Sequence, residues 1–275
     1  MRFPSRAVPV ALVAVAAAIC SGCFQLSTVM MLKADGSGTI QQRMLFTQAA
    51  LEQLRGFAAL GGGKSQGFDP MSEQQARDEA KSLGAGVTYV SSTPVKNAVG
   101  EGRDIIYAFT DVNQLSLAQQ PPTPGGLSIH SDATPAGPQV TFKLTKLANG
   151  DALLTIAMPR PQLPGAGGSP GGSSPTGMGQ VPPEQLEMFK QMFGGARVFI
   201  GVEPVGTLVK TSSPFVTGNR VTLMDVDLDQ LLTNDAALGK LQASKNESDV
   251  KSALAGLPGI KVNVDPEITI EFKPR

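Results

Sequence analysis

The sequence is poor in the residues from which most catalytic and metal sites are built. Its 275 residues include one histidine, two cysteines and no tryptophan. A zinc site needs several thiolate or imidazole ligands, and a serine or cysteine nucleophile needs a histidine placed by a recognisable motif. We therefore predict no metal, no cofactor and no catalytic residue, and we interpret the protein as non-enzymatic.

An excess of charge of one sign is also missing. Lysine plus arginine and aspartate plus glutamate both number 23, so the formal net charge is zero. Proteins that bind nucleic acids need a basic field, so we expect no nucleic-acid partner. Hydrophobic residues make up 41% of the chain and charged residues 17%, which is enough apolar side chain to bury a core. The length suits one large domain or two small ones.

Long hydrophobic runs are absent except near the N-terminus. Residues 1–6 carry Arg2 and Arg6 without an acid, and an unbroken apolar stretch follows over 7–19. A basic start, an apolar stretch of roughly 7–15 residues and small residues after it are typical of a secretory signal peptide. The stretch is too short to cross a hydrocarbon layer of about 30 Å as a helix. The pattern predicts a cleaved signal peptide rather than a membrane span.

The end of this segment resembles the lipobox of bacterial lipoproteins. Ser21 and Gly22 supply the small residues before Cys23, whereas Cys20 stands where leucine is usual. The resemblance implies a signal peptide over 1–22, acylation of Cys23 with fatty acids such as palmitate, and anchoring on the extracytoplasmic side of the cell envelope. Phe24 is not the aspartate that favours inner-membrane retention, so an outer membrane is favoured where the source has one. The alternative is plain secretion with a free thiol at Cys23.

Glycine, proline and serine concentrate in one long internal segment, residues 159–180. Such a composition cannot bury enough apolar surface to offset the entropy of ordering. We expect a flexible linker that is dispensable for folding. It would separate an N-terminal part of the ectodomain, 23–158, from a C-terminal part, 181–275. A second proline- and glycine-rich stretch over 119–138 is interpreted as a loop.

Apolar residues alternate with polar ones in many short segments, which predicts β-strands. Turn sequences between them predict hairpins at 35–38, 149–150 and 218–219. Helix signals follow several strand pairs, and a shift in the apolar phase predicts a bulge near Asp225. Separate helices are predicted from Asp69 and over 246–255. We therefore predict an α+β fold: an antiparallel sheet built from β-hairpins, each followed by a short helix, with the helices packed on one face.

Two stretches resemble the LppM-like group of bacterial lipoproteins. The cysteine leads directly into a hairpin with the turn sequence from Asp35 to Thr39, and residues 206–223 are similar to a second hairpin of that group. The resemblance implies an α+β ectodomain tethered to the envelope, with lipid or glycolipid contact suggested for some members. It brings no catalytic residues to this chain.

Three patterns suggest sites, and each has a simpler explanation. Residues 63–65 end like a phosphate-binding loop but lack its first glycine and its preceding strand, so a glycine loop is favoured. Asp225, Asp227 and Asp229 have the spacing that opens a calcium loop, without its later glycine and glutamate. Polar strand positions and a helix start explain them better. His130 lies in a loop with no second ligand nearby and is interpreted as solvated.

One apolar face could make contacts outside the core. A helix predicted to open at 182–184 carries four large apolar residues on one side: Leu186, Phe189, Met192 and Phe193. Methionine-rich faces suit adaptable apolar contacts. Packing in the core is the favoured interpretation, and a lid or a partner-binding helix is the alternative.

These observations predict a lipid-anchored, non-enzymatic lipoprotein of the bacterial cell envelope that binds a lipid, a glycolipid or an envelope protein. The alternative is a structural assembly subunit of an envelope complex, acting through its strand edges. A coherent apolar cavity under the sheet would favour a ligand, and a solid core with an exposed apolar patch would favour a protein partner.

Overall fold

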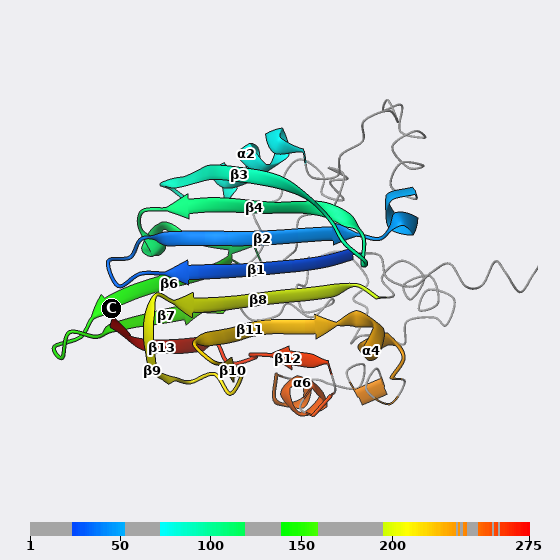
Figure 1. The fold of residues 1–275 in the computed structure, drawn as a ribbon. Helices are drawn as coiled ribbons and strands as arrows, with labels where there is room; N and C mark the ends of the chain where they lie inside the picture. The colour runs from blue at the N-terminus through cyan, green and yellow to red at the C-terminus, as the bar shows by residue number, and fades with distance from the viewer. Residues whose placement is uncertain are drawn as a thin grey trace, which may run out of the picture.

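The structure is a computed structural model that describes residues 24–52, 72–118, 139–158, 195–234, 236, 239–240, 247–254, 256–257 and 259–275. These residues form two β-sheets with a few short helices, so the fold is broadly α+β, as predicted (Figure 1). Several features of the sequence lie outside the described residues: Cys23, the signal peptide, residues 63–65, His130, the segment 159–180 and the face at 186–193.

Sheet 1 has eight strands in the order β10-β11-β8-β1-β2-β4-β3, and β12 also pairs with β11. Its strands are β1 (Phe24–Leu32), β2 (Gly38–Phe46), β3 (Val87–Lys96), β4 (Glu101–Phe109), β8 (Arg197–Pro204), β10 (Val216–Thr217), β11 (Arg220–Asp227) and β12 (Ile260–Val262). Sheet 2 has five strands in the order β5-β6-β7-β13-β9. They are β5 (Ser116–Ala118), β6 (Gln139–Lys146), β7 (Ala152–Ala157), β9 (Gly206–Thr211) and β13 (Glu267–Pro274).

The hairpins form where the turn sequences predict them. β1 pairs antiparallel with β2 across the turn at 35–38, and β6 pairs with β7 across 149–150. In the first turn the Asp35 carboxylate accepts hydrogen bonds from the backbone N–H and the hydroxyl of Ser37, at 2.9 and 2.7 Å. Gly36 and Gly150 have positive φ, at +90° and +87°, which glycine adopts without strain. Local chemistry therefore determines these turns.

The prediction of one antiparallel sheet is wrong in two respects. The strands divide between two sheets, and β1 and β8 run parallel, with Gln25 paired to Arg197 and Leu32 to Pro204. The parts 23–158 and 181–275 both supply strands to each sheet, since β8 joins β1 and β13 joins β7. The alternation of apolar and polar residues predicts which side chains share one face of a strand. It does not predict which other strand pairs with that strand. A parallel pair needs a long crossover, which no turn sequence announces.

Helices are α2 (Glu73–Ser82), the 3₁₀ turn η3 (Val112–Gln114), α4 (Leu228–Leu232) and α6 (Glu247–Leu254). α2 begins later than the predicted Asp69, because Ser72 and Gln75 form a reciprocal capping box. Thr47 caps the helical turn at 48–52 and accepts a hydrogen bond from the Ala50 N–H at 3.3 Å. The predicted regular repeat of a hairpin followed by a packed helix is not confirmed, because α2 contacts β3 and α6 contacts β12, and each helix precedes the strand that it contacts.

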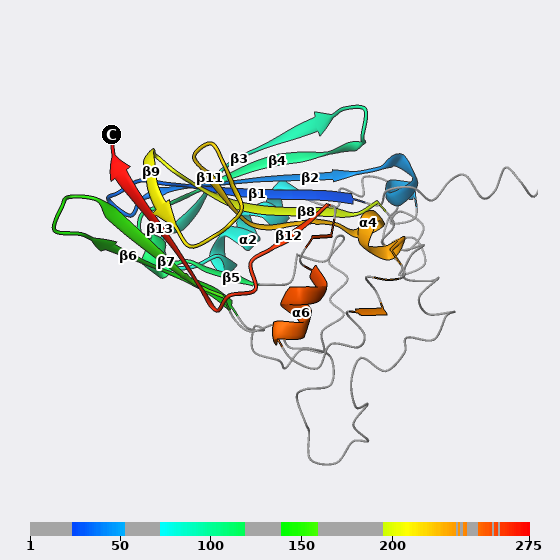
Figure 2. The same cartoon turned by 90° about the horizontal axis from the view of Figure 1, so that it is seen from below.

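The core lies between the two sheets. Figure 2 shows sheet 2 inclined to sheet 1, with α2 on the same side of sheet 1 as sheet 2. The inner face of sheet 1 contributes Leu26, Met30, Ile40, Met44, Tyr107 and Phe109, and sheet 2 contributes Phe142, Leu154, Ile156, Ile268, Ile270 and Phe272. These side chains are all at most 5% exposed. The outer face of sheet 1 is therefore left free of the described helices and of sheet 2.

Candidate functional site

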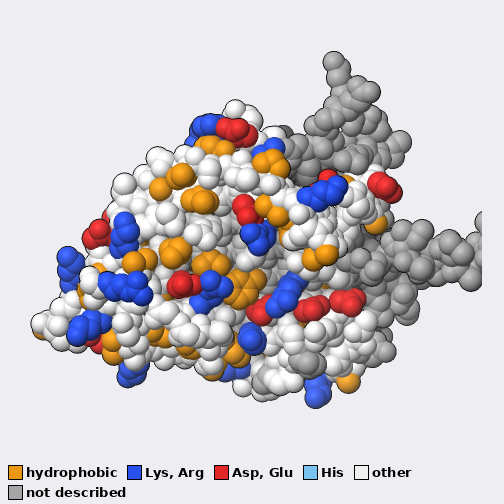
Figure 3. Space-filling model, in the orientation of Figure 1, with side chains coloured by type: hydrophobic (Ala, Val, Ile, Leu, Met, Phe, Trp, Pro, Cys, Tyr) orange, Lys and Arg blue, Asp and Glu red, His pale blue; other side chains and the backbone are white. Residues whose placement is uncertain are grey.

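The outer face of sheet 1 carries a hollow of about 350 Å³ over β8, β11 and β12. Its lining residues are Phe199, Glu203, Thr217, Asn219, Arg220, Thr222, Asp225 and Lys261. Figure 3 shows this face, where acidic and basic side chains lie among scattered hydrophobic ones. Of these residues the sequence suggested only Asp225 as a possible site residue, because they come from four strands and a turn that only the sheet brings together.

The strand pairing aligns the lining residues in rows. Asp225 of β11 is paired with Phe199 of β8 on one side and with Lys261 of β12 on the other. Thr222 is paired with Gly201. Paired residues point to the same face of a sheet, so all these side chains share the outer face.

A bulge in β11 makes this arrangement possible. Thr222 and Asp225 are three residues apart, and in a regular strand they would point to opposite faces. The pairing with β8 shifts register between Thr222 and Met224, which places both on the outer face. The buried Asn263 supports the bulge by donating hydrogen bonds to the carbonyl oxygens of Thr222 and Leu223, at 2.7 and 3.2 Å. The predicted bulge near Asp225 is thus present two residues earlier.

The aromatic wall of the hollow depends on a glycine. The Phe199 ring lies over Gly201, where an added Cβ would come within 3.1 Å of two ring carbons. The same Cβ would lie 3.4 Å from Cδ of Arg220, whose guanidinium carbon is 5.9 Å from the Phe199 ring centroid. A glycine within a strand often marks such a close approach. Gly201 therefore lets the ring and the arginine stem lie close to the sheet.

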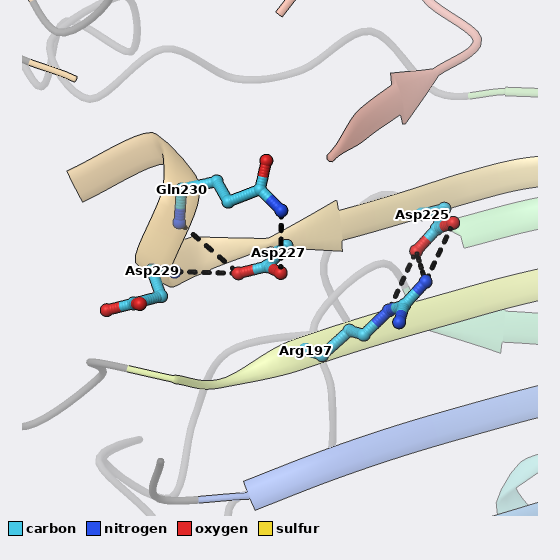
Figure 4. A network of polar contacts seen from close by, with 5 residues as sticks. All are labelled: Arg197, Asp225, Asp227, Asp229 and Gln230. Carbon is cyan, nitrogen blue, oxygen red and sulfur yellow. Dashed lines mark hydrogen bonds and ion pairs between the residues drawn. The ribbon is translucent and has the colours of Figure 1, made fainter. Parts of the chain in front are cut away.

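Two arginines hold the two acids of the hollow in place. Arg220 donates from Nε and Nη2 to Oε2 of Glu203, at 2.9 and 2.8 Å. Arg197 donates from Nε and Nη2 to the two oxygens of Asp225, both at 3.2 Å (Figure 4). Paired forks of this kind restrict both side chains. Lys261 is exposed, and no ion pair joins it to another residue that the structure describes.

Asn219 lines the hollow, but its side chain forms hydrogen bonds with the backbone. Its Nδ2 donates to the carbonyl oxygens of Pro204 and Gly206, at 2.7 and 2.9 Å, and its Oδ1 accepts from the Leu208 N–H at 2.7 Å. These three groups lie where the chain passes from β8 in sheet 1 to β9 in sheet 2. Because its side-chain amide is fully engaged, Asn219 is a structural joint rather than a group available to a ligand.

The three aspartates with calcium-loop spacing do not converge. Asp225 faces Arg197, whereas Asp227 caps α4 by accepting from the backbone N–H groups of Asp229 and Gln230, at 3.1 and 3.2 Å. Figure 4 shows the Asp229 carboxylate directed away from both. Within the described ranges, no three His, Cys, Asp or Glu side chains form a group able to hold a metal ion. Strand and cap positions account for these residues, as the sequence suggested.

A second polar cluster lies on the inner face of sheet 1, under α2. Glu79 accepts hydrogen bonds from the buried Tyr107 hydroxyl at 3.1 Å and from Nε2 of Gln42 at 3.3 Å. Burial raises the pKa of the Glu79 carboxyl above its ordinary value of 4.5, and the two hydrogen bonds only partly oppose this effect. Oε1 of Gln42 has no partner among the described residues. Nothing in the sequence indicated that Glu79 would be partly buried while its neighbour Asp78 is exposed.

Comparisons with known proteins give a sparse result. No helix within the described ranges has the length and apolar character needed to cross a membrane. No protein-family model matches the chain, and no curated protein sequence is similar enough to count as a relative. Among solved structures, the NMR structure of the folded domain of Mycobacterium tuberculosis LppM matches over 92% of this chain and 91% of that one, at 8% identity and a TM-score of 0.32. That is a weak structural relationship to one LppM domain.

Proposed function

We propose that the protein is a lipid-anchored, non-enzymatic component of a bacterial cell envelope, which binds an envelope molecule through the outer face of sheet 1. The observation that carries the proposal is the position of β1. This strand begins at Phe24, the residue after the expected acylation site Cys23, and it lies in the middle of sheet 1. An anchor at Cys23 would hold the sheet against the membrane without a spacer.

This attachment would also orient the hollow. β1 and β8 are parallel, so both strands begin at the same end of sheet 1, and that end would face the membrane. Gly201 is level with Val29, five residues beyond Phe24. Since Cys23 precedes Phe24 by one residue, a strand rise of about 3.3 Å per residue would place the hollow roughly 20 Å from the anchor along the strand. That height favours the polar part of an envelope molecule over acyl chains.

The strand edges support the alternative function, an assembly subunit, less well. The outermost strand β3 carries Pro94, and its pairing with β4 shifts register between Tyr89 and Ser91. β9, at the edge of sheet 2, pairs with β13 through a similar shift. β5 and β10 have only three and two residues. Bulges, prolines and short edge strands all hinder the addition of a further strand. The broad outer face is therefore the better contact surface.

Fractionation of the source cells tests the anchor. Cys23→Ala should move the protein from the membrane fraction to the soluble extracytoplasmic fraction, because the acylated side chain is lost. Cys20→Leu is the matched control, since it removes the other cysteine of the same segment and supplies the leucine that is usual at that lipobox position, and it should remain in the membrane fraction. Retention of the Cys23→Ala variant in the membrane would contradict the proposal.

Photo-crosslinking in living cells tests the binding face. A benzoylphenylalanine introduced at Thr217, an exposed residue in the lining of the hollow, should give a discrete adduct. The same residue introduced at Thr207, exposed on β9 of sheet 2, is the control and should give none. Adducts from Thr207 alone would place the contact surface on sheet 2 instead.

A further inference from the structure

The charges around the hollow cancel one another. Among the lining residues, the carboxylates of Glu203 and Asp225 are balanced by the cations of Arg220 and Lys261, and Arg197, which lies outside the lining, pairs with Asp225. An anionic ligand would lie close to two carboxylates, and a cationic one would meet Lys261 and two guanidinium groups. Electrostatic complementarity therefore favours a ligand without net charge.

Hydrogen-bonding groups nevertheless remain for a ligand. Glu203 binds Arg220 through Oε2 alone, so its Oε1 can accept from a ligand. The hydroxyl of the exposed Thr217 can donate and accept, and the exposed Lys261 ammonium carries three donors. Acceptors and donors lie close together here, so a neutral ligand must carry several groups that can both donate and accept hydrogen bonds. Hydroxyl groups have that property.

The Phe199 ring adds an apolar surface beside these polar groups. The C–H face of a sugar ring is apolar while its hydroxyls project from the edge, so a sugar can cover an aromatic ring and bind flanking polar groups at once. A volume of about 350 Å³ is at the small end of the roughly 300–1,000 Å³ found for ligand pockets, which suits one or two sugar rings.

Peptides and lipid chains fit the hollow less well. β8 is paired with β1 on one side and with β11 on the other, so its backbone groups are not available to an added peptide strand. A single aromatic ring on an open sheet face cannot enclose an acyl chain, which needs a continuous apolar lining.

We propose that the hollow formed by β8, β11 and β12 is a binding site for a neutral saccharide unit. This inference rests on the proposed function and names the chemical class of its ligand. Phe199 supplies the stacking surface, Oε1 of Glu203 accepts from hydroxyls, and Lys261 donates to them. Arg197 and Arg220 position the two carboxylates, and Gly201 allows the ring to lie against the sheet.

Saturation-transfer NMR on the full mature chain tests this site. The protein is held in phosphocholine micelles, because a maltoside detergent would itself present sugars. Maltose, cellobiose, chitobiose, mannobiose and trehalose are the probes, with trialanine as a peptide probe. At least one disaccharide should receive saturation at its ring protons. Lys261→Ala and Phe199→Ala should each weaken its binding about tenfold, the effect of losing one charged hydrogen bond or one stacking contact.

The matched control is Lys210→Ala, which removes an exposed lysine from β9 of sheet 2 and should leave binding unchanged. Lys261 is itself exposed, so its variant remains informative if Phe199→Ala fails to fold. Absence of binding to every disaccharide, equal binding by all three variants, or saturation of trialanine alone would overturn the saccharide site. Fractionation of the Lys261→Ala variant separates the two proposals, because a failed sugar site leaves membrane attachment intact, whereas a failed anchor does not.

Discussion

Asn219 should contribute to stability far more than an ordinary turn residue. Its side chain joins the β10–β11 turn to the segment where the chain leaves sheet 1 for sheet 2, through three hydrogen bonds to Pro204, Gly206 and Leu208. Two of these three backbone partners, at Pro204 and Gly206, belong to buried residues. Replacing Asn219 with alanine leaves all three backbone groups without their partner.

The magnitude follows from those three bonds. Each hydrogen bond contributes about 0.5–1.5 kcal/mol net, and buried carbonyls that lose a donor lie toward the upper end. Asn219→Ala should therefore lower the free energy of unfolding by about 3 kcal/mol, out of a typical total of about 5–15 kcal/mol. Asn219→Asp keeps the acceptor for the Leu208 N–H but points a carboxylate at two carbonyl oxygens. It should cost at least as much.

Urea unfolding followed by circular dichroism measures these differences. The control is Asn149→Ala, because the Asn149 side chain bonds only to Asp151 within an exposed turn, at 2.9 and 3.0 Å. No described residue other than glycine has a positive φ, so neither replacement of Asn219 would meet backbone strain of that kind. If Asn219→Asp stays within about 0.5 kcal/mol of the wild type, the range of a neutral surface change, the joint does not exist as described.

Two further predictions concern Glu79 and the apolar face at 186–193. Because burial raises the pKa of Glu79, the folded state holds its proton more tightly than the unfolded state does, and stability from this residue is lost as pH rises above its ordinary pKa of 4.5. We compare the free energy of unfolding of the wild type with that of Glu79→Gln. The wild-type value minus the variant value should decrease as the pH is raised from 4.5 to the raised pKa of Glu79. An increase of this difference with pH would contradict the prediction. So would the same pH dependence for the exposed control Glu267→Gln. Phe189→Ser combined with Met192→Ser should cost about 2–5 kcal/mol for each residue if the face packs in the core, as we expect. A loss near zero in urea unfolding, with weakened partner capture, would instead identify a lid or a contact helix.

Local features of the fold could be predicted from the sequence because they depend on neighbouring residues alone. The turns at 35–38 and 149–150 use glycines with positive φ, and the cap at Thr47 uses a side chain three residues from its donor. The alternation in β1 separates the buried Leu26 from its polar neighbours Gln25 and Ser27. The same local chemistry placed the start of α2 a few residues early, because Ser72 with Gln75 makes the stronger cap.

What lay beyond the sequence was decided by contacts between distant segments. The parallel pairing of β1 with β8 and the division into two sheets depend on which apolar faces can be buried together, and a period of two is the same for any partner. The hollow has the same origin, since Phe199, Asp225 and Lys261 become neighbours only when β8, β11 and β12 align. Glu79 differs from Asp78 only because one of them faces Tyr107 across the α2–sheet contact. Turn chemistry and periodicity are local and can therefore be predicted from the sequence, whereas strand partners and burial are properties of the packed molecule.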